Sequence, residues 1–283
     1  MKSLVITTME RVAAGISVPE MYKMIKEIYR VATPMEFLAI CRHPQTPEEM
    51  QKQMAASVRL MLGDDENARA VRCKRKSISE HVTLFTTPEP GKRLLIGFCG
   101  RSNLIFMPTA IYMQILDGRA DLAVFGDPQQ TGFTNGVYGY APTFEDAMKK
   151  ATGDLRLADY DDIRTFGASG GGAPAIAAGQ MLGARVMVSF GGRSPTRTLR
   201  YGDTPGAVAM EQRLSDPALA GRAFAVFAED NAEDSESGRH LGELGAITVM
   251  PIPGHDQHNV VHQLHIAGEL EPLFVRLGLI PAA

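Results

Sequence analysis

A serine between two glycines stands where a predicted strand turns into a predicted helix. Residues 162–172 read as a short strand and a tight turn, and Gly167-Ala168-Ser169-Gly170-Gly171 fits the pattern G-x-S-x-G. In a strand–turn–helix setting, such a turn strains the serine backbone and exposes its hydroxyl at the start of the helix. A serine hydroxyl can attack an acyl carbon once a nearby imidazole accepts its proton. The stretch therefore predicts nucleophilic catalysis by Ser169, against the simpler interpretation of a glycine-rich turn with an incidental serine.

Strands and helices alternate around this turn. Short apolar strands alternating with helices predict a mostly parallel sheet that is covered by helices on both faces, the α/β class. Two or three hairpin-like strands should come first, at 71–78, 81–86 and 94–98. The later strands are expected at 122–125, 163–166, 186–190, 223–227 and 247–250, and the helices at 104–116, 144–155, 173–182, 207–214, 235–244 and 259–277.

The first part of the chain, residues 1–68, has helical rather than strand periodicity. Apolar residues recur every three or four positions from Met21 to Tyr29, which is typical of an amphipathic helix. A later helix should start with Thr46 as its cap and Pro47 at its first position. We interpret 1–68 as a helical extension that packs on the α/β domain of residues 69–283. A lid over the active site or a docking segment is the sharper hypothesis.

The composition excludes several classes of function. The chain has 283 residues, of which 45% are hydrophobic, and a net charge of −3, so no basic face for nucleic acid is indicated. Cys41, Cys73 and Cys99 are widely spaced, which indicates neither a zinc site nor disulfides. No other metal or cofactor is predicted. Neither a signal peptide nor a membrane span is recognisable, so a cytoplasmic location is expected, with a homo-oligomer left open.

The turn and the order of elements together resemble the α/β-hydrolase superfamily over roughly residues 70–283. The resemblance implies an α/β-hydrolase fold and a catalytic triad. The nucleophile should follow the fifth strand, an acid the seventh and a histidine the eighth, in the chain order Ser, Asp or Glu, His. This sequence has candidates for all three in that order.

The expected acid falls in the loop 229–234, which holds four carboxylates in six positions. Asp230 ranks first by its distance from the strand end, followed by Asp234 and then Glu229. The alternative is a solvated loop in which Asp234 caps the next helix.

Two histidines compete for the base after the eighth strand. His255 follows a glycine, as is common in the family, and His258 directly precedes an apolar helix start. We favour His258, because a loop-to-helix junction would hold its ring above the sheet edge. His262 and His265 are interpreted as packing or surface residues on that helix.

The loops at the same edge should complete the site. An oxyanion hole needs backbone N–H groups, which the resemblance assigns to Gly170 and to the loop after Phe98, with Cys99 or Gly100 as donor. Arg101, beside it, could bind an anionic or sugar substrate, or form a surface ion pair. The glycine- and aromatic-rich stretch 126–140 and the stretch 191–197 should rim the site, with Tyr138 and Tyr140 stacking on substrate.

These features predict a serine hydrolase that cleaves an ester or thioester of a small acyl compound. The GASGGG and GFCGR stretches are also similar to hydrolase-like proteins associated with bacterial polysaccharide and glycoprotein export, which would imply a glycan-linked acyl substrate. An acyltransferase to a sugar hydroxyl could use the same triad. A non-catalytic interaction module is the alternative from another class.

Overall fold

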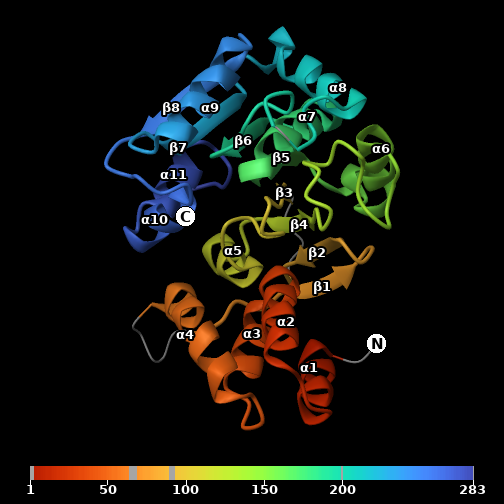
Figure 1. Cartoon of the computed structure of the whole chain (residues 1–283), viewed down its shortest axis with the longest axis vertical. Helices are drawn as coiled ribbons and strands as arrows, with labels where there is room; N and C mark the ends of the chain where they lie inside the picture. Colours follow the sequence, from red (N-terminus) through yellow and green to blue (C-terminus); the bar gives the residue numbers. More distant parts are fainter. Residues whose placement is uncertain (1–2, 64–68, 89–92, 199, 283) are drawn as a thin grey trace.

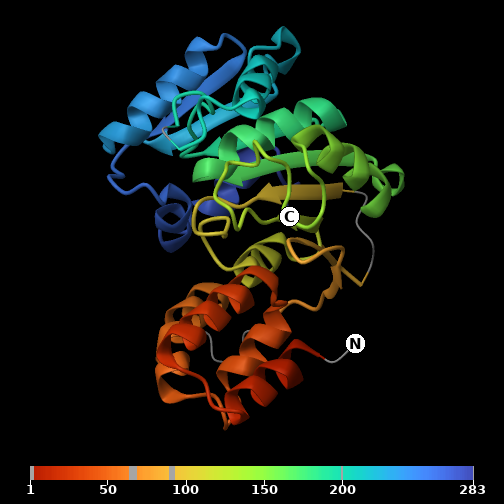
Figure 2. The same ribbon diagram turned by 45° about the vertical axis from the view of Figure 1, so that its right-hand side comes forward.

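Four helices precede the sheet. The computed structural model describes residues 3–63, 69–88, 93–198 and 200–282. Ser17 and Thr33 each form a capping box with a glutamate three residues later, Glu20 and Glu36, which satisfies N–H groups at a helix start. Figure 2 shows these four helices gathered at one end of the molecule. The helices are α1 (Leu4–Ala13), α2 (Val18–Val31), α3 (Pro34–Cys41) and α4 (Glu48–Leu62).

Eight strands form one sheet in the order β1-β2-β4-β3-β5-β6-β7-β8. The pairs β1–β2 and β2–β4 are antiparallel and the others are parallel. This mostly parallel sheet, with the serine turn after its fifth strand, is the expected α/β-hydrolase fold. The strands are β1 (Lys74–Ser77), β2 (Val82–Thr86), β3 (Arg93–Phe98), β4 (Asp121–Phe125), β5 (Asp162–Ala168), β6 (Val186–Phe190), β7 (Ala223–Ala228) and β8 (Ile247–Ile252).

Helices cover both faces of the sheet (Figure 1). Successive side chains of a strand point to opposite sides, and the buried strands carry apolar residues on both. One hydrophobic cluster joins the sheet to α5, α10, α11 and the N-terminal helices, and the other joins it to α6, α7, α8 and α9. These elements are α5 (Thr109–Leu116), α6 (Phe144–Asp154), α7 (Gly172–Leu182), α8 (Pro205–Leu214), α9 (Ala232–Glu243), α10 (Val260–Ile266) and α11 (Leu270–Arg276), with short 3-10 turns η1 (Leu157–Asp159), η2 (Ser169–Gly171) and η3 (Pro217–Leu219).

Two predicted helices are shorter than expected. The helix expected at 104–116 begins only at Thr109, because Phe106 has a positive φ of 68° and Ile105 forms a β-bridge with Met107. The helix expected at 259–277 is two helices, α10 and α11. They are separated at Gly268, whose φ of 74° ends a helical run.

The expected start of α4 was also wrong. Pro47 occupies the cap position rather than the first helical position. The hydroxyl of Thr46 donates instead to the carbonyl of Ile40, 2.6 Å away. This buried bond ties the loop back to α3 rather than capping α4.

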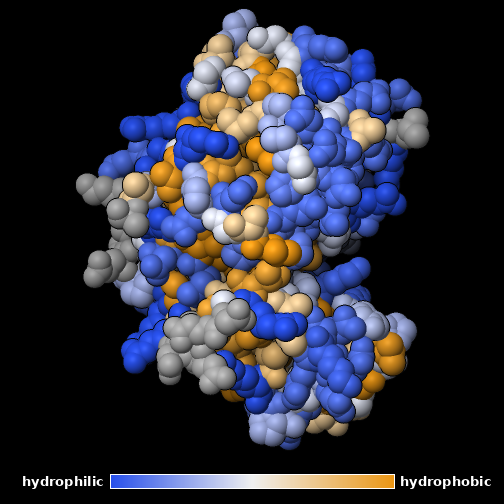
Figure 3. All heavy atoms as spheres, turned by 90° about the vertical axis from the view of Figure 1, so that its left-hand side faces the viewer, coloured by the Kyte–Doolittle hydropathy of each residue, from blue (hydrophilic) through white to orange (hydrophobic). Residues whose placement is uncertain are grey.

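The N-terminal helices reach the end of the sheet that carries Ser169. Arg30 of α2 is 7% exposed and donates to the carbonyl of Glu80, and its own carbonyl accepts the hydroxyl of Thr109. On the face shown in Figure 3, hydrophobic residues gather where the N-terminal helices meet the part of the molecule that holds the sheet. No helix in the described ranges has the length and hydrophobicity to cross a membrane.

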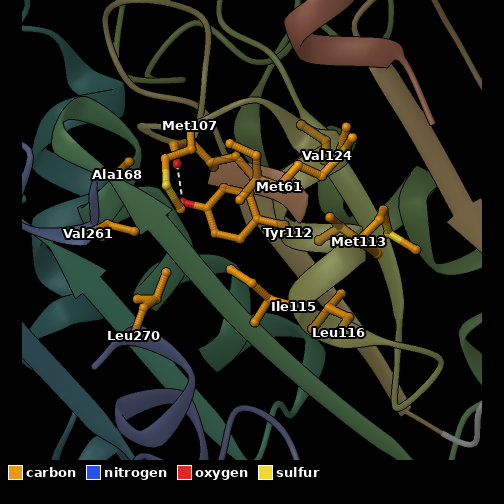
Figure 4. Packing of buried hydrophobic residues seen from close by; sticks show 14 of the residues in the cluster. Met61, Met107, Tyr112, Met113, Ile115, Leu116, Val124, Ala168, Val261 and Leu270 are labelled. Carbon is orange, nitrogen blue, oxygen red and sulfur yellow. Dashed lines mark hydrogen bonds between the residues drawn. The ribbon is translucent and has the colours of Figure 1, made fainter. Parts of the chain in front are cut away.

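Tyr112 anchors the segment that leads from β3 to α5. It is 1% exposed, and its hydroxyl donates to the carbonyl of Ile105, a bond that Figure 4 shows among the packed side chains. Its ring also lies near Phe166 and Phe274. These contacts of Tyr112 therefore hold the segment between β3 and α5 in place.

Tyr112→Phe should destabilise the protein by about 1–3 kcal/mol, because the ring packing stays but a buried carbonyl loses its donor. Urea unfolding of this variant, compared with Tyr22→Phe at a residue that is 41% exposed, measures the difference. Equal unfolding free energies in the two variants would contradict this role.

Candidate active site

The turn that carries Ser169 has the strained geometry of a nucleophile elbow. Ser169 is partly exposed and has a φ of 53°, in the left-handed region that residues other than glycine rarely adopt. The turn η2 and helix α7 follow directly. A Cβ atom on Gly171 would lie 2.2 Å from the carbonyl oxygen of Phe98. Only glycine therefore allows α7 to approach the end of β3 this closely.

Asp234 and His258 are hydrogen-bonded beside this turn. Oδ1 of Asp234 lies 2.7 Å from Nδ1 of His258, and Asp234 is 1% exposed. A carboxylate accepts, so the proton stays on Nδ1, and Nε2 is free to accept a proton from a nucleophile. Asp234 is the third residue of α9, and Asn231 caps that helix by accepting its N–H. The alternative interpretation of Asp234 as the helix cap is therefore wrong, since Asn231 has that role.

Two consecutive glycines lie between the imidazole of His258 and the turn that carries Ser169. A Cβ atom on Gly191 would lie 3.3 Å from Cε1 of His258, and one on Gly192 would lie 3.4 Å from the carbonyl oxygen of Ser169. On its other side, the imidazole meets the ring of Phe106 edge-on, with 5.3 Å between the centroids. The start of the loop after β6 thus passes close to both residues.

The other candidates for the acid and the base lie apart from this pair. Glu229 and Asp230 are exposed, and the backbone N–H of Asp230 donates to the carbonyl of His255. His255 thus takes part in a contact between loops, through its backbone. His262 and His265 lie on α10 as expected, and Nε2 of His265 contacts the carbonyl of Leu60 on α4.

The two N–H groups expected to form the oxyanion hole after β3 have other acceptors. The N–H of Cys99 donates to Phe125, and that of Gly100 donates to Leu104, each over 2.9 Å. Cys99 continues the pairing with β4, and Gly100 closes a tight loop. The loop still touches the nucleophile turn, since a Cβ atom on Gly100 would lie 3.0 Å from Cβ of Ser169.

Two other backbone N–H groups are alternative candidates for the oxyanion hole. For the N–H of Arg101, no protein acceptor is found within the described ranges. Gly170 follows the nucleophile at the start of a helical turn, where the first N–H groups have no partner within the helix. The N–H groups of Arg101 and Gly170 are therefore the remaining candidates for the oxyanion hole.

Cys99 is unsuited to act as a second nucleophile. Its side chain is 1% exposed, and burial raises the pKa of its thiol to about 12. The thiol therefore stays protonated at neutral pH, and only the thiolate is strongly nucleophilic.

The predicted aromatic rim is divided between the surface and the core. Tyr138 is 54% exposed, whereas Tyr140 is 8% exposed and packs edge-on against Phe125. The ammonium of Lys150 lies 4.4 Å from the ring centre of Tyr140. Both tyrosines line a surface pocket of about 360 Å³, but neither Ser169 nor His258 is among its lining residues. Little of the Tyr140 side chain is therefore exposed for stacking on a substrate.

Tyr201 is a residue of the site that the sequence reasoning missed. Its hydroxyl would lie 3.8 Å from a Cβ atom on Gly170 and 2.4 Å from one on Gly132. It is partly buried, and burial raises the pKa of its hydroxyl. No sequence motif marks it, because its contacts come from loops far away in the chain.

No family model matches the sequence, and no curated protein matches it. The chain is similar to the solved structure of dienelactone hydrolase from Anabaena variabilis, with 14% identity over 74% of this chain and 99% of that chain and a TM-score of 0.49. It is similar to carboxyl esterase 2 from Tuber melanosporum, with 9% identity over 77% of this chain and 90% of that chain and a TM-score of 0.48. It is also similar to TT1662 from Thermus thermophilus, with 17% identity over 72% of this chain and 99% of that chain and a TM-score of 0.43. Likenesses at this level carry no argument about the activity or the substrate of this chain.

Proposed function

We propose that this chain is a serine hydrolase that cleaves carboxylic esters or thioesters, with Ser169, His258 and Asp234 as its triad. The observation that carries the proposal is the hydrogen bond of His258 to the buried Asp234, beside a serine in a left-handed turn. A structural histidine would need neither the strained serine nor a buried carboxylate partner.

The residues divide the reaction into two half-reactions. Oγ of Ser169 attacks the acyl carbon while Nε2 of His258 takes its proton, and the imidazolium then protonates the departing alcohol or thiol. Water next attacks the acyl-serine ester, His258 accepts the proton of that water, and the acid departs as the proton returns to Ser169. Asp234 keeps the imidazole in its tautomer throughout.

The negative charge that develops on the carbonyl oxygen needs two donors. The N–H groups of Gly170 and Arg101 are the ones that we propose. Preorganised backbone donors of this kind typically contribute about 3–4 kcal/mol each to lowering the barrier. Tyr201, whose hydroxyl lies near Gly170, would border the bound acyl group.

A fluorophosphonate probe tests the nucleophile directly. It should label the wild-type protein and fail to label Ser169→Ala, because the probe traps only an activated serine. Ser215→Ala, at an exposed serine that ends α8, is the matched control and should label like the wild type. Absence of labelling in the wild type would instead favour a non-catalytic binding module.

A further inference from the structure

The loops on both sides of Ser169 are rich in arginine. β3 and β6 are the two neighbours of β5 in the sheet, so the loops that follow them flank the end of β5 from either side. Residues 99–108 and 191–204 together carry four arginines, Arg101, Arg193, Arg197 and Arg200, and a single carboxylate, Asp203. This local excess of positive charge contrasts with the net charge of −3 of the whole chain.

The arginines adjoin residues that touch the nucleophile turn. Arg101 follows Gly100, which lies close to Ser169 on the side of β3. Arg193 follows Gly192, which lies close to Ser169 on the side of β6. Arg200 precedes Tyr201, and the charges of Arg193 and Arg200 both act on the Tyr201 hydroxyl, counteracting the rise in its pKa that burial causes. The charges of Arg193 and Arg200 thus reach the Tyr201 hydroxyl, which lies near Gly170.

Three of these arginines have no carboxylate within 4 Å in the part of the chain that the structure describes. Arg193 pairs with Glu233 at 2.6 Å, and Arg200 donates to the amide oxygen of Gln130. At the opposite end of the sheet, by contrast, Arg93 and Arg164 share Asp162. The arginines at that end of the sheet therefore share a carboxylate, whereas Arg101, Arg197 and Arg200 have none among the described residues.

Two carboxylates near the site, Asp127 and Glu211, have partners of their own. Asp127 is 7% exposed and accepts the N–H of Gly132. Glu211 accepts the hydroxyls of Ser194 and Thr196, which fastens the loop 191–204 to α8. The loop that carries three of the arginines is thus held in place, and the acid that holds it is occupied.

We propose that the substrate of this site carries an anionic group, a carboxylate or a phosphate, that binds to Arg101 and the arginines of 191–204. A guanidinium binds such oxyanions through two parallel hydrogen bonds. Positive loops around a site also draw anions toward it. This inference rests on the proposed ester hydrolysis and adds the class of substrate.

Two pairs of esters that differ in charge test the inference. p-Nitrophenyl hydrogen succinate against p-nitrophenyl butyrate places the charge on the acyl part, and 4-carboxyphenyl acetate against phenyl acetate places it on the alcohol. In at least one pair, the wild type should favour the anionic member in kcat/KM by about tenfold or more, the effect of one charge-assisted hydrogen bond. That preference should shrink in 0.5 M NaCl, because salt screens exposed charges.

Arginine variants connect the preference to the loops. Arg101→Gln, Arg197→Gln and Arg200→Gln should each lower the ratio of kcat/KM for the anionic and neutral members, and together they should abolish it. Arg11→Gln, on α1 in an exposed pair with Glu27, removes the same charge elsewhere and should keep the wild-type ratio.

The outcomes separate this inference from the function on which it rests. If no ester is cleaved, the proposed function fails, and this inference fails with it. If the neutral esters are cleaved but both pairs give ratios near one, or if the triple variant keeps the preference, only the anionic substrate class is overturned.

Discussion

His258→Ala is expected to reduce kcat for ester hydrolysis by about a thousandfold or more, with little change in KM. The imidazole bonds to Asp234 and lies beside Gly191, so its removal takes away the proposed acceptor of the serine proton. The measurement is steady-state kinetics with p-nitrophenyl butyrate. Thermal unfolding of the same samples checks that loss of the contact with Phe106 leaves the protein folded.

His255→Ala is the matched control, because it removes a neighbouring histidine from the same loop. We expect its kcat to stay within a few-fold of the wild type, since His255 contacts Asp230 through its backbone carbonyl and alanine keeps that bond. If His258→Ala retained more than a tenth of the wild-type rate while His255→Ala lost activity, the base would be assigned to the wrong residue.

The fold could be predicted from the sequence because its determinants are local and periodic. Each of the apolar strands expected after residue 100 is present, in the expected order. Adjacent positions such as Met187 and Val188 point to opposite faces of the sheet and are both buried, as expected for a parallel sheet between helices. The errors arose where a single residue overrides periodicity, as at Phe106 and Gly268, whose positive φ angles interrupt apolar runs.

The site was less predictable, because its parts depend on contacts between distant segments. Ser169 could be identified because glycines on both sides encode the turn. The oxyanion donors could not be assigned, since the sequence does not show that the N–H groups of Cys99 and Gly100 already donate to Phe125 and Leu104. Tyr201 could not be identified from the sequence either, because its neighbours Gly132 and Gly170 are distant from it in the chain.

The ranking of the acids shows how a helix boundary changes the chemistry. Distance from the strand end favoured Asp230, and that reasoning started the next helix at residue 235. Asn231 in fact caps the helix, which begins at Ala232. Asp234 therefore lies on its first turn, buried and bonded to His258, while Asp230 remains exposed.

Asp234→Asn is expected to lower kcat by about 10⁴-fold while leaving the backbone in place. An amide is similar in size to the carboxylate, but it can donate to Nδ1 and so favour the tautomer in which Nε2 carries the proton and cannot act as a base. It also no longer stabilises the imidazolium that forms during attack. Kinetics with p-nitrophenyl butyrate and labelling by the fluorophosphonate probe measure the loss, and both should fall together.

Asp230→Asn removes the same charge four residues away and should change kcat by no more than a few-fold, because Asp230 is exposed. The comparison separates a specific partner of His258 from a general effect of acidic charge, since both variants alter net charge equally. A large loss in Asp230→Asn with a small loss in Asp234→Asn would mean that the loop rearranges when substrate binds. Similar small losses in both would show that His258 works without either carboxylate.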